Sequence, residues 1–232
     1  MNTENTIINI AVQSKYPEVL EKFKESFYAT TKHFKNLTLY EITGENYGAK
    51  EINKILRPIT AKKQGGIFGV YNDDLIFSEG WLESVVEALN TYEAISPGYV
   101  ETKDCEIFKK AVEATKDDNG VIDLLYGPIH TFRVDIFEKI GMFDERFDWS
   151  VDDLDWAWRL KLNKMKSATL RKITVMHLFH ETLNKNEKNW NSLHKKNKEL
   201  FYDKHGYRAY RRIRELYAGH QYFKEFANER KS

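Results

Sequence analysis

Acidic side chains follow a short apolar run at residues 66–72, and this arrangement predicts that a positive group lies beside them. The run GIFGVYN has the composition of a buried strand, and Asp73 and Asp74 come directly after Asn72. Carboxylates at the end of a buried strand cost several kcal/mol unless a positive group meets them. We therefore expect a basic side chain or a metal ion beside Asp73 and Asp74. The alternative is that these residues cap the next helix or turn, where Asp is favoured.

A second acidic group and two histidines add to the candidate ligands. The segment VDDLD occupies residues 151–155, and His177 and His180 lie near the end of the last apolar run. Carboxylate oxygens together with an imidazole suit Mg²⁺ or Mn²⁺, which keeps open positions for phosphate oxygens. The sequence thus predicts a phosphate-handling metal site. For His177, a hydrogen-bonded histidine at a strand end is the alternative.

The segment VDDLD also begins a predicted helix. Its three aspartates fall in or just before the first turn, where the helix dipole favours the ionised carboxylate by a few tenths to about 1 kcal/mol. Asp155 is four residues before Arg159 and is expected to pair with it along the helix, in a structural role. Asp152 and Asp153 remain as the candidates for accepting a proton.

The elements that must position these residues alternate along the first half of the chain. Strands are expected at residues 6–13, 37–43 and 66–72, and helices that begin at Pro17, Ala49 and Gly80. Pro58 should end or bend the second of these helices. The alternation predicts an α/β fold with a mostly parallel central sheet flanked by helices. Ligands bind at the carboxyl ends of the strands in such sheets, here at residues 43–48 and 72–74.

The second half of the chain has a less regular pattern. A helix is expected near residues 103–116, a strand-like segment at 121–127, a helix at 152–163 and a last strand within 166–180. Residues 185–232 hold 13 Lys and Arg against 6 Asp and Glu, whereas residues 1–184 hold 23 against 29. Such a basic tail indicates either an anionic partner or a solvated helical extension. Four arginines of a predicted amphipathic helix pair are the candidates for contact with an anionic polymer or membrane surface: Arg208, Arg211, Arg212 and Arg214.

Composition excludes several classes of protein. A single cysteine, Cys105, excludes a disulfide framework and a cysteine-based zinc site. No run of about 20 apolar residues is present and no signal peptide is recognisable, so a soluble, cytoplasmic protein is expected. The glycines of GGIFG do not link a strand to a helix as a dinucleotide fingerprint does. No GxxxxGK loop and no GxSxG elbow occurs.

Four segments together resemble the family 2 glycosyltransferases, which have the GT-A fold. They are NYGAKEIN (46–53), YNDDLIFSEGWLE (71–83), FEKIGMFDERFDWSVDDLDWAWRL (137–160) and VMH (175–177). The resemblance covers roughly residues 5–206, and the third segment is the most specific of the four. It implies a catalytic domain at residues 1–184 with a Rossmann-like nucleotide-sugar-binding half at about 1–98 and an acceptor-binding half at about 99–184. Residues 185–232 would form a basic helical extension.

The resemblance also implies roles for individual residues. Asp74 matches the last acid of the family's metal-binding DxD motif, His177 matches a histidine that reaches the metal or the diphosphate, and His180 is a second candidate. Asp153 matches the general base, with Asp152 beside it. Contacts to the nucleotide sugar are expected from Glu45, Asn46, Gly48, Asn53, Asn72 and Asp73. Two departures stand out: Asn72 replaces the first acid of the motif, and TGEN at 43–46 replaces a nucleoside-binding run.

The implied activity is transfer of a sugar from a nucleotide diphosphate sugar, UDP-sugar by default, to an acceptor hydroxyl with inversion. Mn²⁺ or Mg²⁺ would be the cofactor, and the acceptor would be a sugar, a glycan or a modified DNA base. Two alternatives stay open. A GT-A-like nucleotidyltransferase would normally carry a Gly-rich, basic signature near its N-terminus, which this chain lacks. A non-catalytic carbohydrate- or nucleic-acid-binding module is favoured only by Asn72 and the altered loop.

Overall fold

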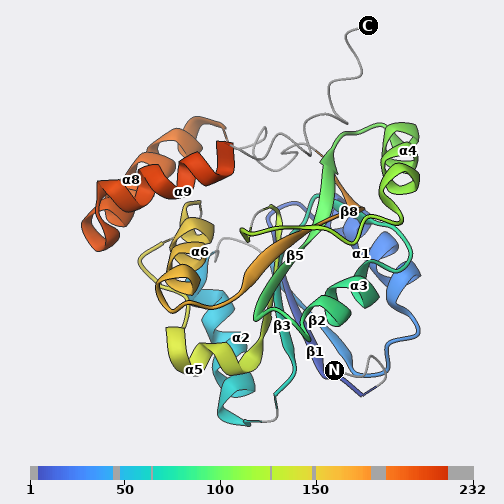
Figure 1. Ribbon diagram of the computed structural model, residues 1–232, viewed down its shortest axis with the longest axis horizontal. Coiled ribbons are helices and arrows are strands. Elements are labelled where there is room, and N and C mark those ends of the chain that lie inside the picture. The colour runs from blue at the N-terminus through green and yellow to red at the C-terminus, as the bar shows by residue number, and fades with distance from the viewer. Residues whose placement is uncertain are drawn as a thin grey trace, which may run out of the picture.

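The computed structural model describes residues 5–43, 48–63, 65–125, 127–147, 150–178 and 187–218, with only the backbone described at 187–190 and 216–218. A central β-sheet lies between two groups of helices, and a C-terminal helix pair lies beside one of these groups (Figure 1). The strand order is β2-β1-β3-β7-β5-β8-β4, with β6 paired to β8. The fold class expected from the sequence is therefore confirmed as α/β.

The first half of the sheet is parallel. It consists of β1 (Ile8–Ser14), β2 (Leu37–Thr43) and β3 (Ile67–Asn72). β1 is buried along its whole length and pairs in parallel with β2 and β3. The three strands therefore end at the same edge of the sheet, which carries Ser14, Thr43 and Asn72.

The second half of the sheet is mixed in direction. It contains β4 (Leu75–Phe77), β5 (Ala94–Glu101), β6 (Val121–Ile122), β7 (Ile129–Arg133) and β8 (Ser167–His177). β7 is antiparallel to both β3 and β5, so β5 runs in the direction of β3. β8 is parallel to β5, so His177 at its end reaches the carboxyl edge that Asn72 also reaches.

Each face of the sheet has its own apolar core. On one face, α1 (Pro17–Thr31), α3 (Trp81–Ala88) and α4 (Cys105–Thr115) bury aromatic side chains such as Phe23, Phe27 and Trp81. On the other, α2 (Ala49–Ala61), η1 (Val134–Ile136), α5 (Phe137–Ile140) and α6 (Asp152–Leu162) pack around Phe132 and Trp156. The two groups of helices are visible on opposite sides of the sheet in Figure 1.

Two expectations from the sequence need correction. The helix α2 does not end at Pro58 but continues to Ala61. Because Pro58 lies in the last turn, it removes only one hydrogen bond of a helix whose Ile52 and Leu56 are fully buried. The strand expected at residues 121–127 is only two residues long, β6, since Leu124 and Leu125 leave the ladder to fill the core instead.

The described helices of the C-terminal extension pack against α6 and the segment that precedes it. The helices α8 (Glu187–His205) and α9 (Tyr207–Ala218) bury Phe201, Ala209 and Ile213 in a third apolar cluster. This cluster also contains Phe147, Val151, Leu154 and Ala157, so the pair covers the beginning of α6. No helix in the described part of the chain is long and apolar enough to span a bilayer.

Candidate active site

The first acidic pair lies at the carboxyl end of β3 and is deeply buried. Asp73 and Asp74 are each only 3 % exposed. The register of β1 and β3 places Gln13 beside Asn72, so that Ser14 follows next to Asp73. Ser14 Oγ donates a hydrogen bond of 2.5 Å to Asp73 Oδ2. Asp73 is thus tied to the end of β1, whereas Asn72 itself is exposed.

Asp74 meets His177 because β4 and β8 pair antiparallel. Leu75 lies opposite His177 in this ladder, and Leu178 N donates to Asp74 O at 2.9 Å. His177 Nε2 lies 3.2 Å from Asp74 Oδ1, and both side chains are about 95 % buried. On its other side, His177 Nδ1 lies 3.9 Å from Glu101 Oε1. The side chain that meets the buried Asp74 carboxylate is therefore a histidine ring.

The geometry of the Asp74–His177 pair fits a divalent ion. Two ligands at adjacent positions around an ion, each about 2.1–2.3 Å from it, are roughly 3 Å from each other, which matches the observed 3.2 Å. No group of three His, Cys, Asp or Glu side chains that could hold a metal occurs among the described residues. Two protein ligands suffice for Mg²⁺ or Mn²⁺ when phosphate oxygens and water complete the coordination. The third predicted ligand, His180, lies outside the described residues.

The residues predicted to contact the nucleotide from the segment after β2 are described only in part. Glu45 and Asn46 lie outside the described residues. Gly48 begins α2 with a left-handed φ of 97°, and its N–H donates to Gln13 Oε1 at 2.6 Å. The start of α2 is thereby held at the end of β1.

Asn53 has a clear structural role. Its side chain is 1 % exposed, its Nδ2 donates to Phe143 O at 2.8 Å, and its Oδ1 accepts from Phe143 N at 3.0 Å. Nδ2 also donates to Glu145 Oε1 at 3.0 Å. Asn53 therefore ties α2 to the segment that leads toward the second acidic pair.

That second acidic pair starts α6, and the topology directs the start of this helix toward the edge of the sheet that carries the first pair. Only residues 163–166 separate the end of α6 from the start of β8, which lies at the amino edge. The 11-residue helix is about 16 Å long and leads through this short turn into β8 (Figure 1). Its first turn, with Asp152 and Asp153, therefore points back toward the carboxyl edge, where Asp74 and His177 lie.

The backbone that leads into α6 is strained. Ser150 has a φ of 80° and Val151 a φ of 68°, both in the left-handed region. A β-branched residue rarely adopts this conformation, which costs about 1–3 kcal/mol per residue unless the surroundings impose it. Asp155 N nevertheless donates to Val151 O at 3.1 Å, so the helix starts directly at this turn.

Burial controls the protonation of the second pair. It raises the pKa of Asp152 well above the ordinary carboxyl range, and the charge of Asp153 raises it further. Burial also raises the pKa of Asp153, although the backbone N–H of Leu154 and the charge of Arg214 partly oppose this. The favourable effect of the helix dipole expected from the sequence, below about 1 kcal/mol, is smaller than the desolvation of these half-buried carboxylates.

Asp155 is structural, as expected, but it has more partners than the sequence indicated. Arg159 Nε donates to its Oδ2 at 2.9 Å, which confirms the predicted helical pair. His205 Nε2 and Lys204 Nζ from the end of α8 lie 2.7 and 2.8 Å from its Oδ1. Burial alone would raise the pKa of Asp155, but the hydrogen bond from His205 and the charge of Arg159 outweigh it and lower the pKa.

Comparison with known proteins finds similarity in structure only. No family model matches the chain, and no curated protein matches its sequence. The structure of GalNAc-T7 with UDP, GalNAc and Mn²⁺ matches with a TM-score of 0.50 and 8 % identity, over 74 % of this chain and 43 % of that one. This chain therefore spans less than half the length of that protein.

Two further structures extend the comparison. The catalytic domain of Drosophila β1,4-galactosyltransferase 7, in complex with xylobiose, matches with a TM-score of 0.54 and 13 % identity, over 76 % of this chain and 72 % of that one. The protein A197 from STIV has a TM-score of 0.48 and 14 % identity, over 76 % and 87 %, and carries no argument here. At these identities the likeness concerns the fold alone: the chain has a GT-A-like fold, with a C-terminal helical part.

Proposed function

We propose that this chain is a glycosyltransferase that moves a sugar from a nucleotide diphosphate sugar, UDP-sugar by default, to an acceptor hydroxyl with inversion. The observation that carries the proposal is the Asp74–His177 pair at the end of a strand of a GT-A-like sheet, with a separation of 3.2 Å that would suit two ligands of one divalent ion. A second acidic pair, Asp152 and Asp153, begins α6, and desolvation raises the pKa of both carboxyls, which supports a role in proton transfer.

In this proposal Asp74 and His177 hold Mn²⁺ or Mg²⁺, with His180 as a further candidate ligand. The ion would neutralise the charge that develops on the departing diphosphate. Asp73, held by Ser14, and Asn72 would orient the donor beside it. Gly48 at the start of α2 would offer backbone to the donor, with Glu45 and Asn46 in the same loop.

Asp153 is the proposed general base. It would take the proton of the acceptor hydroxyl while the oxygen attacks the anomeric carbon from the side opposite the diphosphate. The charge of Arg214 opposes the upward shift of the pKa of Asp153, whereas Asp153 itself raises the pKa of Asp152. In this proposal the charge of Arg214 supports the ionised form of Asp153 as the base, and Asp152 would hold the acceptor hydroxyl.

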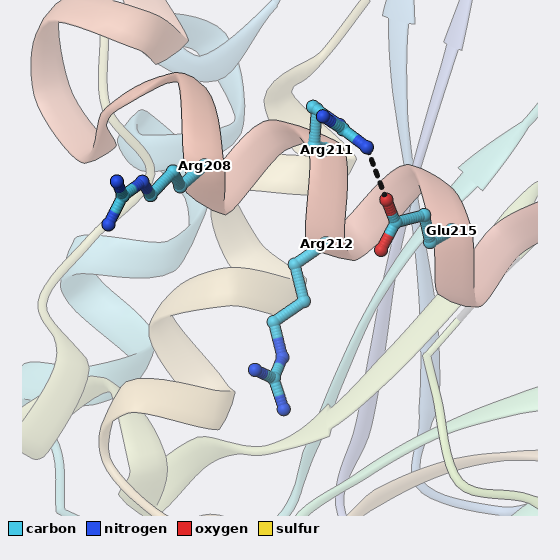
Figure 2. Close-up of a pocket in the computed structure, with 4 residues that line it drawn as sticks. All are labelled: Arg208, Arg211, Arg212 and Glu215. Atoms are coloured by element: carbon cyan, nitrogen blue, oxygen red, sulfur yellow. Dashed lines mark hydrogen bonds and ion pairs between the residues drawn. The ribbon is translucent and has the colours of Figure 1, made fainter.

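We further propose that the exposed side of α9 contacts an anionic part of the acceptor. Arg208, Arg211, Arg212 and Glu215 line an open hollow of about 540 Å³, and Figure 2 shows Arg208 and Arg212 directed away from the Arg211–Glu215 pair. Among the residues that the structure describes, Arg208 and Arg212 have no ion-pair partner. Changing both to Ala should weaken binding to heparin or to anionic vesicles in low salt, with Arg211→Ala as the control. Equal binding by the wild type and by the variant with both Arg208→Ala and Arg212→Ala would contradict this contact.

The central test is incubation with a panel of nucleotide sugars and Mn²⁺. Slow hydrolysis of one donor, stopped by EDTA, is the expected result, and NMR of the product formed with an acceptor should show an inverted anomeric carbon. Release of pyrophosphate from a nucleoside triphosphate and a sugar phosphate would instead indicate a nucleotidyltransferase. Donor binding without any turnover would indicate a non-catalytic module.

A further inference from the structure

The strained turn at Ser150 and Val151 is held from outside its own segment, by the C-terminal helix pair. Asn197 Nδ2, on α8, donates to Ser150 O at 2.9 Å, and Asn197 is completely buried. Ser150 Oγ lies 2.7 Å from His194 Nδ1, one helical turn earlier on α8. The backbone and the side chain of Ser150 are thus both fixed by α8.

Val151 is held by packing from both helices of the pair. Its side chain is 3 % exposed and belongs to the cluster that contains Phe201 of α8 and Ile213 of α9. A valine with a φ of 68° is unfavourable by itself, because its branched side chain crowds the following carbonyl. In the left-handed conformation the side chain of Val151 is buried by α8 and α9, and this burial offsets the unfavourable φ.

The direction of the acidic pair depends on this turn. The peptide groups of Ser150 and Val151 immediately precede Asp152, and Val151 O accepts the first hydrogen bond of α6. A change in the φ of either residue would rotate the first turn of α6 and swing both carboxylates. Fixing the carbonyl of Ser150 therefore fixes where Asp152 and Asp153 point.

We propose that Asn197 is a positioning residue that aims the Asp152–Asp153 pair by holding the Ser150–Val151 turn in its left-handed conformation. The α8–α9 pair is then part of the catalytic unit and not a solvated extension. The catalytic consequence rests on the proposed function, in which Asp153 is the base. The structural half, that α8 holds the turn, stands on the contacts alone.

The test compares Asn197→Ala with Thr115→Val. Thr115 is a matched control because its buried Oγ1 also bonds to the backbone of another element, accepting from Ile173 N at 2.8 Å, on the opposite face of the sheet. Hydrogen exchange of the peptides that cover residues 150–156 should become faster in Asn197→Ala and stay unchanged in Thr115→Val. Unchanged exchange in both variants would overturn the proposal.

Kinetics then separate positioning from general stability. In Asn197→Ala, kcat per folded molecule should fall about 10- to 100-fold because the base is misaligned, while the KM of the donor stays the same. Ser150→Gly added to Asn197→Ala should recover part of kcat, because glycine adopts the left-handed conformation without help. A normal kcat in Asn197→Ala would overturn the catalytic half. If the wild-type chain turns over no donor, the proposed function fails, and hydrogen exchange alone decides whether Asn197 holds the turn.

Discussion

The two acidic pairs of this protein, one at the end of β3 and one at the start of α6, have opposite surroundings. Asp73 and Asp74 each have a close partner, the Ser14 hydroxyl and the His177 ring, supplied by neighbouring strands. Asp152 and Asp153 are neighbours in a half-buried position, and desolvation raises the pKa of both carboxyls. The first arrangement suits carboxylates that stay charged and attract a cation. The second suits carboxylates that exchange a proton near neutral pH.

The two pairs also differ in what holds them. The first depends on β-ladders between segments whose register follows from buried side chains, so it is built into the sheet. The second depends on a strained turn and on a contact from Asn197, which lies 47 residues after Ser150 in the sequence. Damage to the C-terminal helices should therefore affect the second pair and spare the first.

The largest expected effect comes from breaking the first pair. Asp74→Ala removes the carboxylate that lies beside His177 and should abolish transfer and donor hydrolysis, with a fold that circular dichroism cannot distinguish from the wild type. Calorimetric titration with Mn²⁺ in the presence of UDP should lose its binding signal. Full activity of the wild type in excess EDTA, or a stability loss of about 1 kcal/mol with normal turnover, would instead make Asp74 a capping residue.

Breaking the second pair should leave the first intact. Asp153→Asn preserves shape but cannot accept a proton, so turnover should fall roughly 10²- to 10⁴-fold while donor affinity stays nearly the same. Asp152→Asn should retain more activity, because an amide can still hold the acceptor hydroxyl. The assignment would move by one residue if Asp152→Asn were inactive and Asp153→Asn normal, and retention of configuration in the product would contradict single displacement.

The sequence predicted the first pair better than the second, and the reason is physical. Asp73, Asp74 and His177 follow apolar runs whose strand character is local, and parallel strands bring their carboxyl ends together. Nothing in the sequence marks Val151 for a left-handed conformation, since valine is among the residues least suited to it.

The partners of the second pair are likewise not readable from local sequence. Asn197 and His194 contact Ser150 just before the pair, and His205 contacts Asp155 just after it, across 44 to 50 residues of sequence. Asn53 shows the opposite case. It was expected to contact the nucleotide, and in the structure its side-chain amide bonds to the backbone of Phe143. A short motif fixes residue types, but which atoms meet is decided by the packing of distant elements.

A third prediction sharpens the comparison through pH. Because the pKa of Asp152 is raised in the folded protein, folding favours its protonated form. The contribution of Asp152 to the free energy of unfolding is therefore fully present below the unfolded carboxyl pKa of about 4 and is lost as pH rises toward the folded value. Asp152→Asn removes this loss and should be more stable than the wild type at pH 8, by roughly 2 kcal/mol. The advantage should disappear near pH 4.

Urea denaturation of both proteins across this pH range measures the difference. His130, whose pKa burial lowers to about 4, destabilises both proteins alike in acid and cancels in the comparison. A difference between Asp152→Asn and wild type that does not vary with pH would contradict the upward shift.

The smallest expected effect concerns the hydroxyl that ties Asp73 to the end of β1. Ser14 is 1 % exposed, and its Oγ donates to a buried carboxylate. Ser14→Ala leaves that carboxylate with one donor fewer in a site that water hardly reaches, so the free energy of unfolding should fall by about 2 kcal/mol, as for a hydrogen bond to a charged group. The matched control is Ser78→Ala, whose hydroxyl donates to the neutral Thr174 O at 3.0 Å and should cost about 1 kcal/mol or less. If Asp73 belongs to the donor site, saturating Mn²⁺ and UDP should also stabilise Ser14→Ala less than the wild type. Equal losses for the two serine variants would mean that Asp73 is not charged in the folded protein, and the contrast between the two acidic pairs would then be wrong.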